Sequence, residues 1–287
     1  MSSGAPRRYA IAASLIVSLL VGGWMTAGAA LRAQSPSAPV GDALIDIGGR
    51  RLHVSCTGTG SPTVILEAGL GDPLTIWKAV QPGIAGFTRV CSYDRANRGT
   101  SDPDPATGLR TSRSIVEDLD RLLRAAAISG PYVLVGHSLG GAHLRLYASR
   151  FPRGIVGMVL VDSSHEDQIA RFKATGYTPP VSQNSERVDM EASLVEVGRT
   201  PWRADIPLVV LSHGQKVARQ VPDITEEQAA GIEAAWLELQ RDLAARSSQG
   251  RLVIAQGSGH YVHVEEPERV VQAIREVVTA ARSVARR

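Results

Sequence analysis

The sequence predicts an α/β protein built on a mainly parallel sheet that helices cover on both faces. Two observations lead to this fold class. From residue 63 onward, apolar runs of strand length alternate with longer segments that carry apolar residues at helical spacing. The short runs are apolar throughout, which is typical of parallel strands buried on both faces. At 287 residues, 44% of them hydrophobic, the chain can enclose a large core.

The expected elements follow in chain order. A hairpin comes first, because a Gly-Gly turn at 48–49 joins two strand-like segments at 43–47 and 51–56. Further strands are expected at 63–66, 88–93, 132–135, 157–161, 207–211 and 252–255. Helices are expected at 112–127, 140–150, 225–246 and 267–283.

One interval, residues 165–206, interrupts this alternation. It is polar, contains Pro179 and Pro180, and lies between two expected strands. A loop of this length without secondary structure is uncommon in a compact domain, so we expect a small helical insertion. Its position after a parallel strand predicts a cap over the carboxyl ends of the strands, where ligands bind in such sheets.

The N-terminal segment, residues 1–33, predicts export. Its three arginines account for the whole formal charge of +3, and it contains no acidic residue. Two of these arginines precede an uncharged run at 9–31, which fits either a cleaved signal peptide or a retained membrane anchor. Both alternatives place the rest of the chain in the periplasm or outside the cell.

The remaining chain divides into a proline-rich linker at 34–41 and a single domain at 42–287. This remainder has no net charge and no clustered basic surface, which argues against a nucleic-acid partner. An oxidising destination makes the only two cysteines, Cys56 and Cys91, relevant. Both lie in strand-like segments, and either a disulfide or two buried free thiols fits the sequence.

A Gly-His-Ser-Leu-Gly-Gly motif at 136–141 follows the apolar run at 132–135. Where a buried strand ends in G-x-S-x-G and a helix follows, the serine lies on a sharp turn with its hydroxyl exposed. The pattern alone is common by chance. Ser138 becomes a candidate nucleophile only if the chain also supplies a base, an acid and donors for an oxyanion.

His260 is the best candidate for the base among seven histidines. It follows the last expected strand in a glycine-rich loop, from which it can reach a serine on a central strand. A serine at neutral pH needs such a base within hydrogen-bond reach. His137 adjoins the serine and should point away from it, and we expect His263 to be a packing or surface residue.

Five motifs in this order resemble the α/β-hydrolase superfamily, in particular its exported bacterial serine hydrolases. The resemblance covers residues 42–283 and rests on Leu66–Gly71, Ser92–Asp102, the motif at 136–141, Val161-Asp162 and Gly259-His260. It implies an α/β-hydrolase fold with an eight-stranded sheet, in which the second strand is antiparallel and lies beside the fourth. That order would place Cys56 near Cys91.

The acid that orients His260 has several candidates. In many relatives it follows the strand that corresponds to 207–211, but this chain has no carboxylate there before Asp223. In other branches it follows the preceding strand, where this chain has Asp162. A carboxylate at a strand end is well held and would stabilise the imidazolium formed during attack. We therefore expect Asp162, with Asp223, Glu166 and Asp167 as alternatives.

The expected oxyanion hole uses the backbone N–H of Leu139, which follows the serine. The resemblance implies Leu70 as the second donor, because Ala68-Gly69-Leu70 occupies the place of the family's H-G-x motif. The same motifs predict that Asp94-Arg95 and Arg98-Gly99 brace nearby loops by ion pairing.

These features predict a serine hydrolase that cleaves carboxylic esters, or amides or thioesters, through an acyl-enzyme on Ser138. An acyltransferase or a cofactor-free perhydrolase would share the same residues, and a non-catalytic, membrane-tethered binding protein is the alternative outside enzymes. A carboxylate nucleophile is excluded by Ser138. The sequence shows no metal-ligand spacing and no phosphate-binding glycine loop, so we expect no metal and no cofactor. The serine chemistry predicts a small acyl substrate as the partner.

Overall fold

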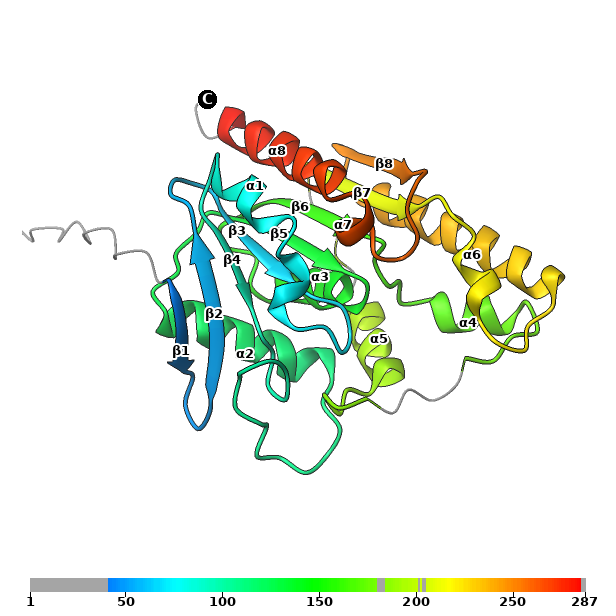
Figure 1. Ribbon diagram of the computed structural model, residues 1–287, viewed down its shortest axis with the longest axis horizontal. Helices are drawn as coiled ribbons and strands as arrows, with labels where there is room; N and C mark the ends of the chain where they lie inside the picture. The colour runs from blue at the N-terminus through cyan, green and yellow to red at the C-terminus, as the bar shows by residue number, and fades with distance from the viewer. Residues whose placement is uncertain (1–40, 180–183, 201, 203–204, 285–287) are drawn as a thin grey trace, which may run out of the picture. The chain divides into compact units, whose positions relative to one another are not determined.

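Eight strands form a single sheet in the computed structural model, which describes residues 41–179, 184–200, 202 and 205–284 (Figure 1). Their order across the sheet is β1-β2-β4-β3-β5-β6-β7-β8. The strands are β1 (Asp42–Asp46), β2 (Arg51–Thr57), β3 (Thr63–Glu67), β4 (Val90–Tyr93), β5 (Tyr132–His137), β6 (Ile155–Val161), β7 (Leu208–His213) and β8 (Gly250–Ala255).

Strand β2 is antiparallel to both of its neighbours, β1 and β4, and every other pair in the sheet is parallel. The predicted sheet, with its antiparallel second strand beside the fourth, is therefore confirmed. Cys56 lies directly opposite Cys91 in the β2–β4 register, and a disulfide joins them. Of the two alternatives for these cysteines, the structure has the disulfide.

Helices cover both faces of the sheet because successive strand residues point to opposite faces. Leu134 and Leu160 pack with α2, α3 and α6 on one face, whereas Val133, Val135 and Val159 pack with α1 and α8 on the other. Figure 1 shows α8 along one side of the sheet and α2 along the other. These helices are α1 (Gln81–Ala85), α2 (Ser112–Ala125), α3 (Leu139–Arg150), α6 (Glu226–Ala244) and α8 (Pro267–Val284).

The inserted interval contains two helices, α4 (Gln168–Lys173) and α5 (Met190–Arg199). Helix α4 packs against α6, and α5 packs against α2 and α3. Four short helices were not expected from the sequence: α1, η1 (Leu74–Trp77), η2 (Val217–Gln220) and α7 (Val262–Glu265). Each is about one turn long, too short to show a helical spacing of apolar residues.

The expected signal peptide or anchor at 1–33 and all but the last residue of the linker at 34–41 lie outside the described residues. Within residues 41–284, as far as they are described, no helix is long and apolar enough to cross a membrane.

Candidate active site

Ser138 lies between the end of β5 and the start of α3, with a positive φ of 51°. Its N–H donates to the carbonyl of Val161 (3.1 Å), and its carbonyl accepts from the N–H groups of Gly141 (3.0 Å) and Ser164 (2.9 Å). The turn requires glycine at 136, where a Cβ would approach the Cα of Gly141 to 2.6 Å. The motif therefore builds the strained strand-to-helix turn that the sequence predicts.

His260 and Asp162 come together at the same edge of the sheet. Asp162 directly follows β6 and has a φ of 44°, and its N–H donates to the carbonyl of Leu211 in β7 (2.7 Å). His260 follows β8, and its Nδ1 lies 2.6 Å from Oδ2 of Asp162. Since a carboxylate only accepts hydrogen bonds, this contact places the Nδ1 proton between the two and turns Nε2 toward other partners.

The carboxylate of Asp162 is fully buried and accepts four hydrogen bonds. Oδ2 faces Nδ1 of both His260 and His213 (2.8 Å), and Oδ1 accepts from the His213 N–H (3.0 Å) and the Trp236 indole (2.8 Å). Burial alone would raise the pKa of Asp162, but the hydrogen bonds from His213 and His260 outweigh it and hold this pKa well below its usual range. The carboxylate therefore stays ionised.

The three alternative acids lie elsewhere. Asp223 is exposed in the segment before α6. Glu166 forms ion pairs with Arg145 and Arg246, each at 2.7 Å. Asp167 is exposed. Among the described residues, Asp162 is the carboxylate within hydrogen-bond distance of His260.

Three residues that the sequence reasoning did not select complete this cluster. His213 ends β7, and its Nε2 lies 2.9 Å from Oε2 of Glu233 on α6. Burial would lower the pKa of His213, but the hydrogen bonds to Asp162 and Glu233 raise it to about 9. Trp236 lies one helical turn after Glu233. One sequence signal could have indicated His213: it ends the strand that follows the Asp162 motif in the chain, and the carboxyl ends of parallel strands meet at one edge of the sheet.

Behind His260 lies a group of buried rings. The Nε2 of His137 lies 3.0 Å from the carbonyl of His260, so the side chain of His137 is directed at the backbone of the His260 loop. Its ring is 4.7 Å from that of His260 and 4.2 Å from that of His263. His263 is fully buried, and burial together with His137 and His260 lowers its pKa to about 2. Burial lowers the pKa of His137 as well. The rings of His137 and His263 are therefore both neutral.

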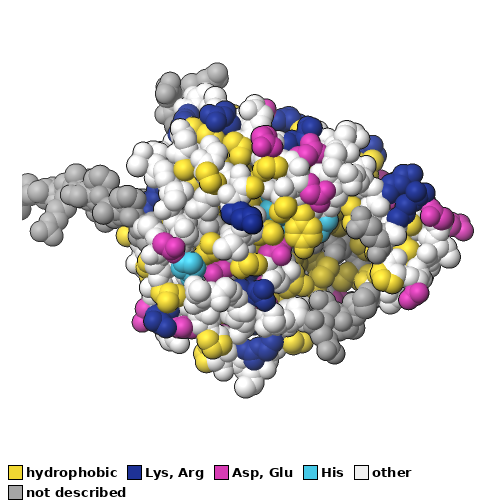
Figure 2. All heavy atoms as spheres, viewed as in Figure 1, with side chains coloured by type: hydrophobic (Ala, Val, Ile, Leu, Met, Phe, Trp, Pro, Cys, Tyr) yellow, Lys and Arg dark blue, Asp and Glu magenta, His cyan; other side chains and the backbone are white. Residues whose placement is uncertain are grey.

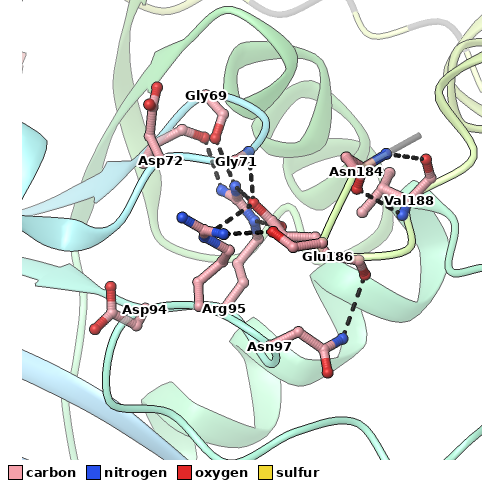
Figure 3. A network of polar contacts seen from close by, with 12 residues as sticks. Gly69, Gly71, Asp72, Asp94, Arg95, Asn97, Asn184, Glu186 and Val188 are labelled. Atoms are coloured by element: carbon pink, nitrogen blue, oxygen red, sulfur yellow. Dashed lines mark hydrogen bonds and ion pairs between the residues drawn. The ribbon is translucent and has the colours of Figure 1, made fainter. Parts of the chain in front are cut away.

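Arg95 and Glu186 hold the loop after β3 (Figure 3). The buried guanidinium of Arg95 donates to the carbonyls of Ala68 (2.7 Å) and Gly69 (2.6 Å). It also donates to both carboxylate oxygens of Glu186, at 2.8 and 2.7 Å. Glu186 in turn accepts the N–H of Gly71 (2.6 Å). Glu186 belongs to the inserted interval, so a buried ion pair and its hydrogen bonds to the backbone join this interval to the loop.

The two expected oxyanion donors lie in this loop and at the start of α3. Leu70 lies between the peptides that Arg95 and Glu186 hold, and Leu139 is the first residue of α3, where an N–H has no partner within the helix. The loop and the helix meet closely, since a Cβ at Gly140 would lie 2.4 Å from the carbonyl of Ala68. Both leucines line the same cavity as Ser138.

A cavity of about 310 Å³ opens beside Ser138 and His260. Its wall is mainly apolar, and Figure 2 shows hydrophobic side chains gathered round a hollow on the viewed face. The inserted interval contributes Gln168, Phe172 and Met190 to the wall. The other lining residues are Leu70, Leu139, Ser164, His213, Val217, Ala218, Val221, Ile232, Glu233 and Trp236. The described residues hold no His, Cys, Asp and Glu group suited to a metal ion.

Known proteins share this fold. The chain is 20% identical to VinJ over 85% of this chain and all of that one, with a TM-score of 0.59. It is 21% identical to a thermophilic esterase from Thermogutta terrifontis, over 84% and 98% of the two chains, with a TM-score of 0.56. These likenesses concern the fold alone.

Sequence relatives extend the match. Residues 62–185 match a family model described as the alpha/beta hydrolase fold. The chain is 28% identical to an AB hydrolase superfamily protein of Gibberella zeae, over 77% of this chain and 87% of that one. It is 31% identical to the uncharacterized protein YqjL of Bacillus subtilis, over 78% of this chain and 86% of the relative. The chain belongs to the α/β-hydrolase family.

Proposed function

We propose that this protein is a serine hydrolase that cleaves carboxylic esters through an acyl-enzyme on Ser138. The observation that carries the proposal is the 2.6 Å contact between His260 and the buried Asp162, on the cavity that Ser138 also lines. An imidazole whose Nδ1 proton is fixed by an ionised carboxylate has Nε2 free to act as the base. This is the arrangement that an unactivated serine needs.

The steps follow from the groups present. His260 accepts the proton of Ser138 as Oγ attacks the ester carbonyl, and Asp162 stabilises the imidazolium. The carbonyl oxygen becomes an oxyanion, which we expect the N–H groups of Leu70 and Leu139 to stabilise. His260 gives its proton to the leaving alcohol, the acyl-enzyme forms, and a water activated by His260 releases the acid.

The cavity favours an uncharged, apolar substrate of modest size. Its volume is near the low end for small-molecule sites. The charged groups in its wall, His213 and Glu233, are paired with each other at 2.9 Å and are not free to bind a charged ligand. We therefore expect short or medium uncharged acyl esters to react faster than charged ones.

Labelling with a fluorophosphonate tests the proposal, because it requires an activated serine. The wild-type protein should be labelled and should hydrolyse p-nitrophenyl esters, and Ser138→Ala should abolish both without loss of fold. Ser164→Ala removes a second hydroxyl from the same cavity and should retain the label. Labelling of Ser138→Ala, or an unlabelled wild type, would exclude this mechanism, and the unlabelled result would favour a binding protein.

Products formed with added alcohol or peroxide distinguish hydrolysis from acyl transfer and perhydrolysis.

We also propose that the domain works outside the cytoplasm. The disulfide between Cys56 and Cys91 supports this, since disulfides persist in oxidising compartments. Cell fractionation tests the location, and the N-terminal sequence of the exported protein tells a cleaved signal from an anchor.

A further inference from the structure

His213 is a fixed cation next to the proposed catalytic pair. Its Nδ1 lies 2.8 Å from Oδ2 of Asp162, and its Nε2 lies 2.9 Å from Oε2 of Glu233. Carboxylate oxygens accept hydrogen bonds and do not donate them, so each ring nitrogen must carry a proton. This geometry requires His213 to be an imidazolium while both carboxylates are ionised. Its raised pKa, about 9, agrees with that state.

Packing holds this cation in place. The side chain of His213 is only 8% exposed, and the ring stacks on Trp236 with centroids 5.9 Å apart. The second oxygen of Glu233 accepts the N–H of Ala218 at 2.6 Å, which fixes the carboxylate from the other side. Neither partner is therefore free to turn away from His213.

The other titratable groups around the cluster carry no competing positive charge. His137 and His263, which pack behind His260, are buried and have lowered pKa values. Tyr261 packs edge-on against His260, and Asp72 lies 3.7 Å from Nδ1 of His137. Glu265 on α7 adds one more anion near His260, because its Oε2 accepts the N–H of Gly259 at 2.9 Å. The charge that reaches His260 through Asp162 depends on three groups: the anions Asp162 and Glu233 and the cation His213.

His213 and His260 share one oxygen of Asp162, and this has an electrostatic consequence. A cation on that oxygen repels the positive charge that His260 acquires during catalysis. Glu233 offsets the cation, so that the three groups together present a single negative charge, as a lone carboxylate would. Without Glu233 the sum would be zero, and without His213 it would be twice as negative.

We propose that His213 and Glu233 are positioning residues that act through Asp162: they hold its carboxylate in place and set the net charge that His260 experiences. The proposal rests on the role proposed above for His260 as the base. Of the two, His213 ends the strand after which, as the resemblance implies, many relatives carry the acid itself.

The pH profile of kcat/KM for a neutral ester tests the proposal. His213→Asn keeps a donor toward Asp162 but removes the cation, so the acid limb should move to higher pH, by about one unit. Glu233→Gln removes an anion while Asp162 keeps His213 protonated, so the limb should move the other way. The double variant restores the single negative charge and should lie close to wild type. A purely structural role would lower the rate without opposite shifts.

Controls separate the outcomes. His53→Asn, on β2 away from the cavity, and Glu238→Gln, on α6 with its side chain exposed, should leave the profile unchanged. Profiles that coincide, or that move in the same direction in both single variants, would overturn the proposal. If the wild-type protein fails to react with the fluorophosphonate, the proposed function fails instead. In that case the ring-nitrogen NMR shifts of His213 still report its charge, and a neutral ring at pH 7 would refute the inference by itself.

Discussion

The indole N–H of Trp236 donates to Oδ1 of Asp162 at 2.8 Å. Trp236 belongs to α6, which follows the inserted interval in the chain, whereas Asp162 precedes that interval. The backbone N–H of His213 donates to the same oxygen. One carboxylate oxygen is thus held by α6 and β7, and the other is left for the two imidazoles. Asp162 comes from β6, but the direction of its carboxylate is set by its neighbours.

Replacing the indole donor tests this. Trp236→Phe keeps an aromatic ring but leaves Asp162 with one hydrogen bond fewer, which costs about 1–3 kcal/mol for a buried charged group. We expect kcat/KM to fall roughly tenfold to a hundredfold if that loss is felt at His260. Trp77→Phe is the matched control, because the buried indole N–H of Trp77 has no partner among the described residues. Steady-state kinetics measures both variants. An equal fall in kcat/KM in Trp236→Phe and Trp77→Phe would contradict the assignment.

The acid itself is tested by Asp162→Asn. An asparagine cannot stabilise the imidazolium and can hold His260 in the wrong tautomer, so kcat should fall by about three to four orders of magnitude. Asp223→Asn and Glu166→Gln, at the alternative positions, should stay within a few-fold of wild type. A large loss in Asp223→Asn with activity retained in Asp162→Asn would reverse the assignment.

The sequence predicted what depends on local chain geometry. The turn at Ser138, the strands on either side of it and the late position of His260 follow from short motifs and from apolar runs. The residues themselves left the disulfide open, and the implied strand order only brought Cys56 near Cys91. Short helices such as η1 were missed because one turn carries no periodic signal.

The supporting residues could not be predicted in the same way. Helix α6 was expected from its pattern, but nothing in that pattern indicates that Glu233 and Trp236 face the end of β6. Glu186 lies in a polar interval between prolines and α5, and its burial against Arg95 depends on how that interval folds back. Such roles come from contacts between distant segments, which a single sequence does not specify.

Glu186 should affect catalysis through the loop that carries Leu70. Glu186→Gln removes the negative charge from Arg95 and weakens the bond to the N–H of Gly71. We expect kcat to fall about tenfold with little change in KM, because an oxyanion donor acts mainly in the transition state. Binding of a trifluoromethyl ketone should weaken in parallel, and binding of the product acid should not. Equal weakening of both ligands would indicate general disruption of the cavity.

The disulfide should stabilise the domain without serving the site. It joins residues 35 positions apart, and closing a loop of that size in the unfolded chain is worth about 3–4 kcal/mol. The double variant Cys56→Ser/Cys91→Ser should lose about this much free energy of unfolding in urea, while its kcat at 25 °C stays near that of wild type. Reductant should destabilise the wild-type protein and leave the double variant unaffected; sensitivity of both would point to another cause.

The raised pKa of His213 predicts how stability depends on pH. A group whose folded pKa, about 9, exceeds its unfolded value of 6.5 stabilises the fold fully below pH 6.5. That contribution is lost as the pH rises through 9, and it amounts to about 3 kcal/mol for this shift. The free energy of unfolding should therefore fall between pH 6.5 and 9.

In His213→Asn the free energy of unfolding should be lower at neutral pH, because Asp162 and Glu233 lose their cation. Its decline toward pH 9 should largely disappear, because the group that releases the proton is gone. The pKa of His53 is also raised: burial lowers it, but Asp42 and Asp94 outweigh that effect. His53 therefore adds to the decline of stability with pH in the same direction, and His53→Asn measures its share. Urea titrations at several pH values measure this decline. If the free energy of unfolding of His213→Asn fell with pH as steeply as that of the wild type, the ionic contact between His213 and its two carboxylates would be contradicted.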